Sequence, residues 1–198
     1  MKSYVYLVLA SLITLTAPVS AQESSATHDW SGVYGGLTYG STGGEVTETI
    51  PVPIIPDQVN NTSTQNSFGL FAGYNWQRDK IVFGGEFVYL NEELPLDGNP
   101  DSIQDDIFEL RGRVGYALNK FHIYGLVGYS ASNYKVRIGA PFKLAGPTLG
   151  LGVEYAVTDS IFVGFEATNR KIEGQSSANI TTIYHDLTSF QFRVGYAF

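Results

Sequence analysis

The chain ends in the stretch FQFRVGYAF, residues 190–198, in which apolar side chains alternate with polar or small ones. Phe190, Phe192, Val194, Tyr196 and Phe198 share one face of an extended strand, because successive side chains of a strand point to opposite sides. A strand that crosses a membrane needs roughly 9–11 residues, with apolar side chains toward lipid and polar ones inward. The stretch therefore predicts a transmembrane β-strand.

Similar alternation occurs in seven stretches upstream, at residues 30–40, 66–77, 81–91, 107–117, 121–130, 148–157 and 161–168. Short polar turns at 77–80, 118–120 and 158–160 alternate with long polar segments at 41–65, 92–105, 131–147 and 169–186, which we expect to be loops. Short turns at one end of an even number of strands and long loops at the other are typical of outer-membrane barrels. The sequence predicts an all-β fold, an eight-stranded antiparallel up-and-down transmembrane β-barrel.

Aromatic residues concentrate at both ends of these stretches. Near the short turns are Trp30, Tyr74, Trp76, Tyr116, Phe121, Tyr155, Tyr196 and Phe198, and near the long segments are Tyr39, Tyr89, Phe108 and Tyr129. Two aromatic girdles fit the two interfaces of a bilayer. The alternative, a soluble barrel of the lipocalin type, gives no reason for rings at both rims.

Residues 1–21 have the layout of a secretory signal peptide: Lys2, an apolar run from Tyr4 to Leu15, and a small-residue cleavage site ending at Ala21. An N-terminal anchor helix is the alternative. We expect removal of 1–21, a polar periplasmic lead-in at 22–29, and a barrel domain at 30–198.

The absence of Cys excludes disulfides and thiolate metal sites. A net charge of −7 argues against nucleic acid as a partner.

The stretch Trp30-Ser31-Gly32-Val33-Tyr34-Gly35-Gly36 resembles the W-x-G-x-Y-x-G opening of the opacity/porin-like outer-membrane β-barrel family, relatives of the OmpA transmembrane domain. Similar strand ends occur as RVGY at 113–116, GVEYA at 152–156 and RVGYAF at 193–198. The resemblance spans 30–198 and implies an integral protein of the bacterial outer membrane with extracellular loops. Unlike OmpA itself, the chain stops at the eighth strand, so no peptidoglycan-binding domain is expected.

The resemblance also gives the last strand a role. In such barrels the terminal aromatic residue is read by the barrel-assembly machinery, which makes that machinery an expected partner. The candidate assembly signal consists of Phe190, Phe192, Tyr196 and Phe198.

Charged residues fall on the inward face of several predicted strands. They are Glu86, Glu109, Arg111, Arg113, Glu154, Glu166 and Arg193. Eight strands leave an interior just wide enough for side chains to fill, so we expect an ion-pair network that plugs the barrel. The alternative is that these charges line a selective pore.

Catalytic, metal and cofactor sites are not expected. His122 lies on an inward face with no evident nucleophile, and Tyr184, His185 and Asp186 form a run that suggests a hydrolase pair or a haem ligand without completing either. Acids in the predicted loops, such as Glu45 and Glu92, are interpreted as a solvated face.

These patterns favour a structural or surface-interaction role: envelope integrity, or adhesion and surface exposure through the loops. A narrow porin-like channel for small solutes is the alternative, and a loop receptor for haem is a weaker one. The expected partners are outer-membrane lipid and lipopolysaccharide, the assembly machinery, and an extracellular ligand or host factor. We expect no enzyme.

Overall fold

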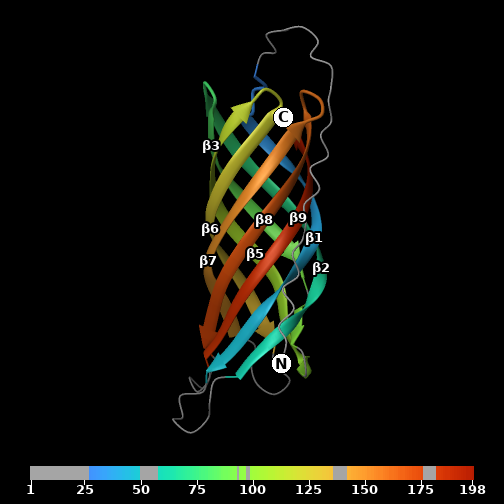
Figure 1. Cartoon of the computed structure of the whole chain (residues 1–198), viewed down its shortest axis with the longest axis vertical. Coiled ribbons are helices and arrows are strands. Elements are labelled where there is room, and N and C mark those ends of the chain that lie inside the picture. Colours follow the sequence, from blue (N-terminus) through green and yellow to red (C-terminus); the bar gives the residue numbers. More distant parts are fainter. Residues whose placement is uncertain (1–26, 50–57, 93, 97–98, 136–141, 176–181) are drawn as a thin grey trace, which may run out of the picture.

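The chain forms a barrel of long antiparallel strands (Figure 1). The computed structural model describes residues 27–49, 58–92, 94–96, 99–135, 142–175 and 182–198, so the predicted signal peptide and residues 22–26 lie outside the described part. Within these ranges there are eight long strands and one short strand: β1 (Gly32–Thr49), β2 (Gln58–Arg78), β3 (Ile81–Asn91), β4 (Leu94–Leu96), β5 (Asn99–Leu118), β6 (Phe121–Lys135), β7 (Phe142–Ala156), β8 (Ile161–Gln175) and β9 (Thr182–Ala197).

The sheet closes because the last strand pairs with the first. Around the barrel the order is β1, β9, β8, β7, β6, β5, β3 and β2, and β2 pairs again with β1. The β1–β9 register runs from Tyr34 opposite Ala197 to Thr49 opposite Thr182, and Figure 1 shows β9 in red beside β1 in blue. Closure leaves no long strand edge with unpaired backbone groups, as a hydrocarbon surrounding requires. The predicted eight-stranded antiparallel barrel is confirmed.

Very short hairpins join the strands at one end of the barrel, as the sequence predicted. Asp79 and Asn119, in the β2–β3 and β5–β6 turns, have φ angles of 55° and 53°. Asp and Asn tolerate this left-handed conformation better than most residues that carry a side chain. In the β7–β8 turn, Ile161 N donates to Thr158 Oγ1 at 2.9 Å.

At the other end the strands continue far beyond the apolar alternation, which corrects the prediction of four long loops. Most of segment 41–65 is strand, because β1 continues to Thr49 and pairs with β2 from Gln58. β6 and β8 likewise extend to Lys135 and Gln175, and β4 lies in another predicted loop. Beyond the hydrocarbon band a hairpin meets water, so its outward face need not be apolar. The sequence signal therefore fades while backbone pairing continues.

The outer face of the barrel is extensively apolar. Leu110 and Leu151 expose 69% and 71% of their surface, which suits a hydrocarbon surrounding and not water. Exposed aromatic rings border this band near the short turns (Tyr74, Trp76, Tyr116, Phe121, Tyr155, Tyr196 and Phe198) and near the loop end (Tyr39, Phe68, Phe108 and Tyr129), where Tyr89 is half-buried. The described residues contain no helix that is both long and apolar enough to cross a membrane.

Two clusters of buried apolar side chains lie inside the barrel. The cluster that reaches the short turns includes Trp30, Tyr34, Phe71, Val82, Ala117, Ala156 and Phe162. The cluster toward the loop end consists of Val46, Leu144, Ile172, Ile183 and Leu187. The first cluster also contains Val88, Leu90 and Ile107, so along β3 and β5 it runs from the short turns past the buried charged side chains toward the loop end.

Candidate functional site

The polar centre of the barrel is built around the carboxylate of Glu86, on β3. Arg111 lies opposite Glu86 on β5, and its Nη2 is 2.6 Å from Glu86 Oε1. Arg113 Nη1 lies 2.8 Å from Glu86 Oε2, and Arg193, on β9, donates to the same oxygen across the interior. One carboxylate is therefore shared by three guanidinium groups.

Two further carboxylates complete the pairing of these arginines. Arg113 Nη2 lies 2.6 Å from Glu154 Oε2, on β7. Glu166, on β8, bridges the other two, with 2.9 Å from its Oε1 to Arg111 Nη2 and 2.7 Å from its Oε2 to Arg193 Nη1. Each guanidinium contacts the central carboxylate and at least one more, which its planar fork of donors permits.

Arg170 is a fourth arginine of this network, although the sequence prediction placed it in a loop. Its Nε donates to Glu109 Oε1 and its Nη1 to Ser189 Oγ. Glu109 Oε2 also lies 3.2 Å from Arg111 Nη1, which joins this pair to the rest. Inward positions recur every second residue along β8, so extending the alternation by two residues beyond Thr168 would have identified Arg170 as an inward residue. The network thus holds four glutamates and four arginines, a balanced set of charges.

These eight side chains are almost completely shielded from solvent. Each residue exposes between 1% and 3% of its surface. The cavity beside them, bordered by Thr38, Phe71 and Gln191, has a volume of about 10 Å³, no more than roughly one water molecule requires. Buried charges are tolerated when they are paired and hydrogen-bonded. The seven predicted residues and Arg170 therefore lie in one filled layer of the interior.

Trp30 lies inside the barrel mouth, which corrects its predicted place in the outer aromatic girdle. It exposes 6% of its surface, and its ring centroid lies 5.3 Å from that of His122 and 5.9 Å from that of Phe162. Trp30 N donates to Gln77 Oε1 at 2.8 Å, and His28 N to the Asn119 carbonyl at 2.9 Å. The end of the lead-in therefore folds over the short-turn mouth. The alternation of side chains along a strand could not predict the burial of Trp30, because Trp30 precedes β1.

His122 is a packed interior residue. Its Nδ1 lies 3.2 Å from Glu154 Oε2, and its ring stacks on Tyr124 at 4.9 Å between centroids. Tyr124 OH donates to Glu166 at 2.8 Å. These contacts tie His122 to the ion-pair network.

The run Tyr184, His185 and Asp186 does not form a single site. Tyr184 and Asp186 are on the exposed outer face, whereas His185 is buried, exposing 2% of its surface. His185 therefore points away from both neighbours, against a shared haem iron or a His–Asp pair. It lies on β9 above the apolar band, where burial lowers its pKa from 6.5 to about 4. Within the described residues, no group of three or more His, Cys, Asp or Glu is placed to hold a metal ion.

Glu92 corrects the interpretation of the loop acids as a solvated face. It exposes only 2% of its surface, and Thr42 Oγ1 donates to its Oε1 at 2.7 Å. Glu45, by contrast, is exposed. The apolar pattern ends near this height of the barrel, so the sequence did not distinguish inward acids from outward ones.

The candidate assembly residues lie on the outer face at the barrel seam. Phe190, Phe192 and Tyr196 expose 50%, 51% and 48% of their surface, and Phe198 exposes 83%. β9, which carries the first three, pairs with β1. Their positions at the closing strand are compatible with a role in assembly.

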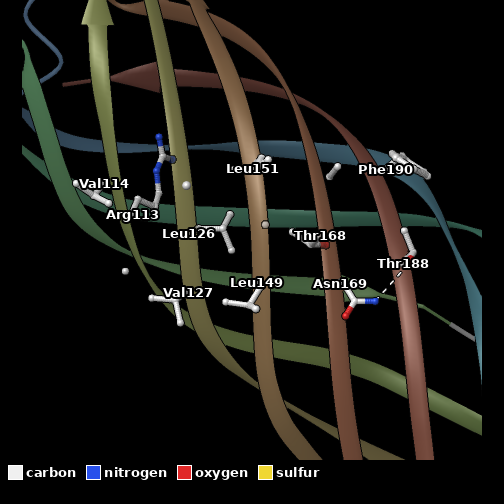
Figure 2. Close-up of a pocket in the computed structure, with 14 residues that line it drawn as sticks. Arg113, Val114, Leu126, Val127, Leu149, Leu151, Thr168, Asn169, Thr188 and Phe190 are labelled. Atoms are coloured by element: carbon white, nitrogen blue, oxygen red, sulfur yellow. Dashed lines mark hydrogen bonds between the residues drawn. The ribbon is translucent and has the colours of Figure 1, made fainter.

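A shallow hollow of about 900 Å³ lies on the outer face of β5–β9 (Figure 2). Small residues, Gly112, Gly125 and Ala167, leave space between larger neighbours such as Leu151 and Phe190. At its loop-side border, Figure 2 shows one row across β6–β9, formed by Val127, Leu149, Asn169 and Thr188. This hollow was not predicted, because its glycines and alanine are ordinary outward positions in the sequence pattern.

Comparison with known proteins gives matches over nearly the whole chain. The family model described as outer membrane protein beta-barrel domain matches residues 7–198. The 25 kDa outer-membrane immunogenic protein of Brucella melitensis is 32% identical over 195 residues, covering 94% of this chain and 87% of that protein. The 22 kDa outer membrane protein of Rhizobium leguminosarum bv. viciae is 33% identical over 132 residues, covering 64% and 58%.

Two solved structures share the fold at low identity. Neisserial surface protein A is 14% identical with a TM-score of 0.52, covering 85% of this chain and 98% of that one. OprG, an outer membrane protein of Pseudomonas aeruginosa, is 16% identical with a TM-score of 0.50, covering 85% and 96%. At these identities the likeness supports the barrel architecture alone.

Proposed function

The chain belongs to the outer membrane protein beta-barrel domain family, and we propose that it acts as a non-conducting barrel that presents its loop end at the cell surface. It is an integral protein of the Gram-negative outer membrane, with a structural and surface-interaction role.

The filled interior is the observation that supports a non-conducting barrel most strongly. A selective pore needs charged groups that face a water-filled path. Here four glutamates and four arginines contact one another, and two clusters of buried apolar side chains share the interior with them. Opening a path would require these pairs to separate in a poorly solvated interior, which is costly. A narrow channel is therefore the less supported alternative.

We place the short-turn end in the periplasm and the loop end outside the cell. Bacterial outer-membrane barrels have short periplasmic turns and longer extracellular loops, and the lead-in, whose Trp30 packs into the short-turn mouth, would then lie in the periplasm. On the same proposal, residues 1–21 are a removed signal peptide, 22–29 a periplasmic lead-in and 30–198 the barrel domain. The outward aromatic side chains at the end of the chain, including Phe198, would serve as the assembly signal.

The loop end is the surface that we propose for an extracellular ligand or host factor, with lipopolysaccharide around the barrel. The Brucella relative is named an immunogenic outer-membrane protein, and this supports surface exposure. We propose no enzymatic activity, because His122 is bound within the ion-pair network. A haem receptor is disfavoured, since Tyr184 and His185 face opposite sides of the wall.

The proposal can be tested in cells by deletion and surface labelling. Deletion should increase sensitivity to bile salts and bulky antibiotics, and the wild-type gene should restore resistance. An epitope inserted between residues 53 and 54, between β1 and β2, should bind antibody on intact cells. Detection only after permeabilisation would show that the orientation is inverted. Unchanged sensitivity after deletion would argue against the structural role.

A further inference from the structure

We propose that the outer face of β6–β9 carries a binding site for one phospholipid with a zwitterionic head group, such as phosphatidylcholine or phosphatidylethanolamine. An acyl chain would occupy the apolar hollow of Figure 2, and the head group a second hollow nearer the loop end. This inference requires only that the barrel lies in a membrane. It does not depend on the proposed surface role; on the proposed orientation the head-group hollow lies in the outer leaflet, so the bound phospholipid would be one held among lipopolysaccharide.

The second hollow has a volume of about 590 Å³ and lies next to the first, on β6–β9 and β1. We call the first the lower hollow and the second the upper hollow, taking the loop end as up, although Figure 1 draws that end at the bottom. On each of β6–β9, a residue that lines the lower hollow is followed, two positions closer to the loop end, by a residue that lines the upper hollow. The pairs are Val127 and Tyr129, Leu149 and Pro147, Asn169 and Lys171, and Thr188 and Asp186. Residues two apart share a face of a strand and lie roughly 6–7 Å apart along it. The two hollows therefore adjoin at the edge of the apolar band.

The lower hollow has the chemistry of an acyl-chain site. Its exposed lining is almost entirely apolar, with Val127, Leu149, Leu151 and Phe190 around the small residues. It lies between the two aromatic girdles, where the surrounding solvent is hydrocarbon. Asn169 stands at its loop-side border, and its Nδ2 donates to Asp186 Oδ1 at 2.6 Å. Polar contacts thus begin where the acyl chain would meet its head group.

The upper hollow has the charges of a zwitterionic head-group site. Lys171 Nζ lies 3.5 Å from Asp186 Oδ2, and both side chains are well exposed. Glu45 and Glu173 also line the hollow, so its lining carries three carboxylates and one ammonium group. Lys171 can bind a phosphate, while the acids and the ring of Tyr129 can bind a quaternary or primary ammonium.

The excess of carboxylates over ammonium groups in the upper hollow should make binding depend on the charge of the lipid head group. A head group with only negative charge, such as phosphatidylglycerol or the phosphorylated sugars of lipopolysaccharide, would meet like charges, and like-charge contacts disfavour binding. A zwitterionic head group offers its own cation to the surplus carboxylates. The charge pattern therefore favours the zwitterionic lipid.

The test is native mass spectrometry of the full-length protein, refolded in detergent and exposed to equal amounts of phosphatidylcholine and phosphatidylglycerol. One phosphatidylcholine should remain bound after gentle activation. Its preference over phosphatidylglycerol should be about fivefold, since exposed ion pairs contribute modestly. Equal retention of the two lipids, preference for phosphatidylglycerol, or retention of neither would overturn the proposal.

Two glycine variants separate specific binding from general adhesion of lipid. A Cβ added at Gly125 makes ordinary contacts with Leu151 Cδ2 at 3.8 Å and the Gly150 carbonyl oxygen at 3.9 Å, and one added at Gly85 meets nothing within 4 Å. Gly125→Leu should fold and lose the bound lipid, because it fills the lower hollow. Gly85→Leu, also on the outer face but outside the hollow, should retain it. Equal effects of both variants would assign the lipid to nonspecific adhesion and refute the site.

A charge-changing variant in the upper hollow tests the proposed contacts with the head group. Glu173→Lys changes the balance of the upper hollow to two ammonium groups and two carboxylates, and should shift retention toward phosphatidylglycerol. Asp159→Lys, an exposed change in the β7–β8 turn at the opposite end, is the matched control and should leave the preference unchanged. An unaltered preference in Glu173→Lys, or the same shift in both variants, would refute the head-group contacts.

Discussion

The Glu86→Gln variant should be much easier to unfold than the wild-type barrel. Three guanidinium groups share this carboxylate, and the substitution leaves one uncompensated positive charge among them. Breaking a buried pair typically costs roughly 3–5 kcal/mol. The loss should not be three times larger, because Arg111 and Arg193 keep Glu166, and Arg113 keeps Glu154. We therefore expect the free energy of unfolding to fall by about 3–5 kcal/mol.

Urea unfolding in lipid vesicles, followed by tryptophan fluorescence, measures this loss. Asp159→Asn makes the equivalent chemical change at an exposed position in the β7–β8 turn, and its effect should stay within about 0.5 kcal/mol. Adding Arg111→Gln to Glu86→Gln restores charge balance, so the double variant should show a coupling energy of about 0.5–3 kcal/mol. If Glu86→Gln were as stable as Asp159→Asn, the network would not support the barrel and the reasoning would fail.

Three further predictions concern packing, pH and assembly. Gly195→Leu should lower the free energy of unfolding by roughly 1–3 kcal/mol, because its side chain would overlap the ring of Phe162; a wild-type urea midpoint would show that the ring can move aside. In acid, unfolded His185 binds its proton near pH 6.5 and folded His185 only near pH 4, so wild-type stability should fall by about 2 kcal/mol from pH 8 to pH 5. His185→Phe should lack this component in the same titration, and identical pH profiles would contradict it. Deleting Phe198 should lower outer-membrane yield more than secretion; normal membrane levels on blots would argue against the assembly signal.

The part of the fold inside the hydrocarbon band could be predicted from sequence because lipid imposes a strict rule. Outward positions such as Leu110 and Leu151 must be apolar. Because side chains alternate along a strand, the residues that alternate with these outward positions are assigned to the interior. The inward positions of Glu86 and Arg111 followed from that rule. Their pairing across β3 and β5 followed from counting residues from the short turns.

Residues outside that band were harder to place, for physical reasons. Around Arg170 and Glu92 the outward face meets water, so polar side chains on both faces remove the alternation. Trp30 lies before the first strand, and its burial depends on how the lead-in folds back onto His122 and Phe162. The outer hollow arises from small side chains on neighbouring strands, a property of register that no single strand reveals.

Single-channel recording in a planar lipid bilayer tests the central claim, that the barrel interior is filled and does not conduct. The measurement uses the unmodified protein, with insertion verified by protease protection in matched vesicles. Because four glutamates and four arginines occupy the interior with a neighbouring cavity of only about 10 Å³, the account predicts no steady channel current. Steady, large single-channel currents from the correctly inserted wild-type protein would contradict it.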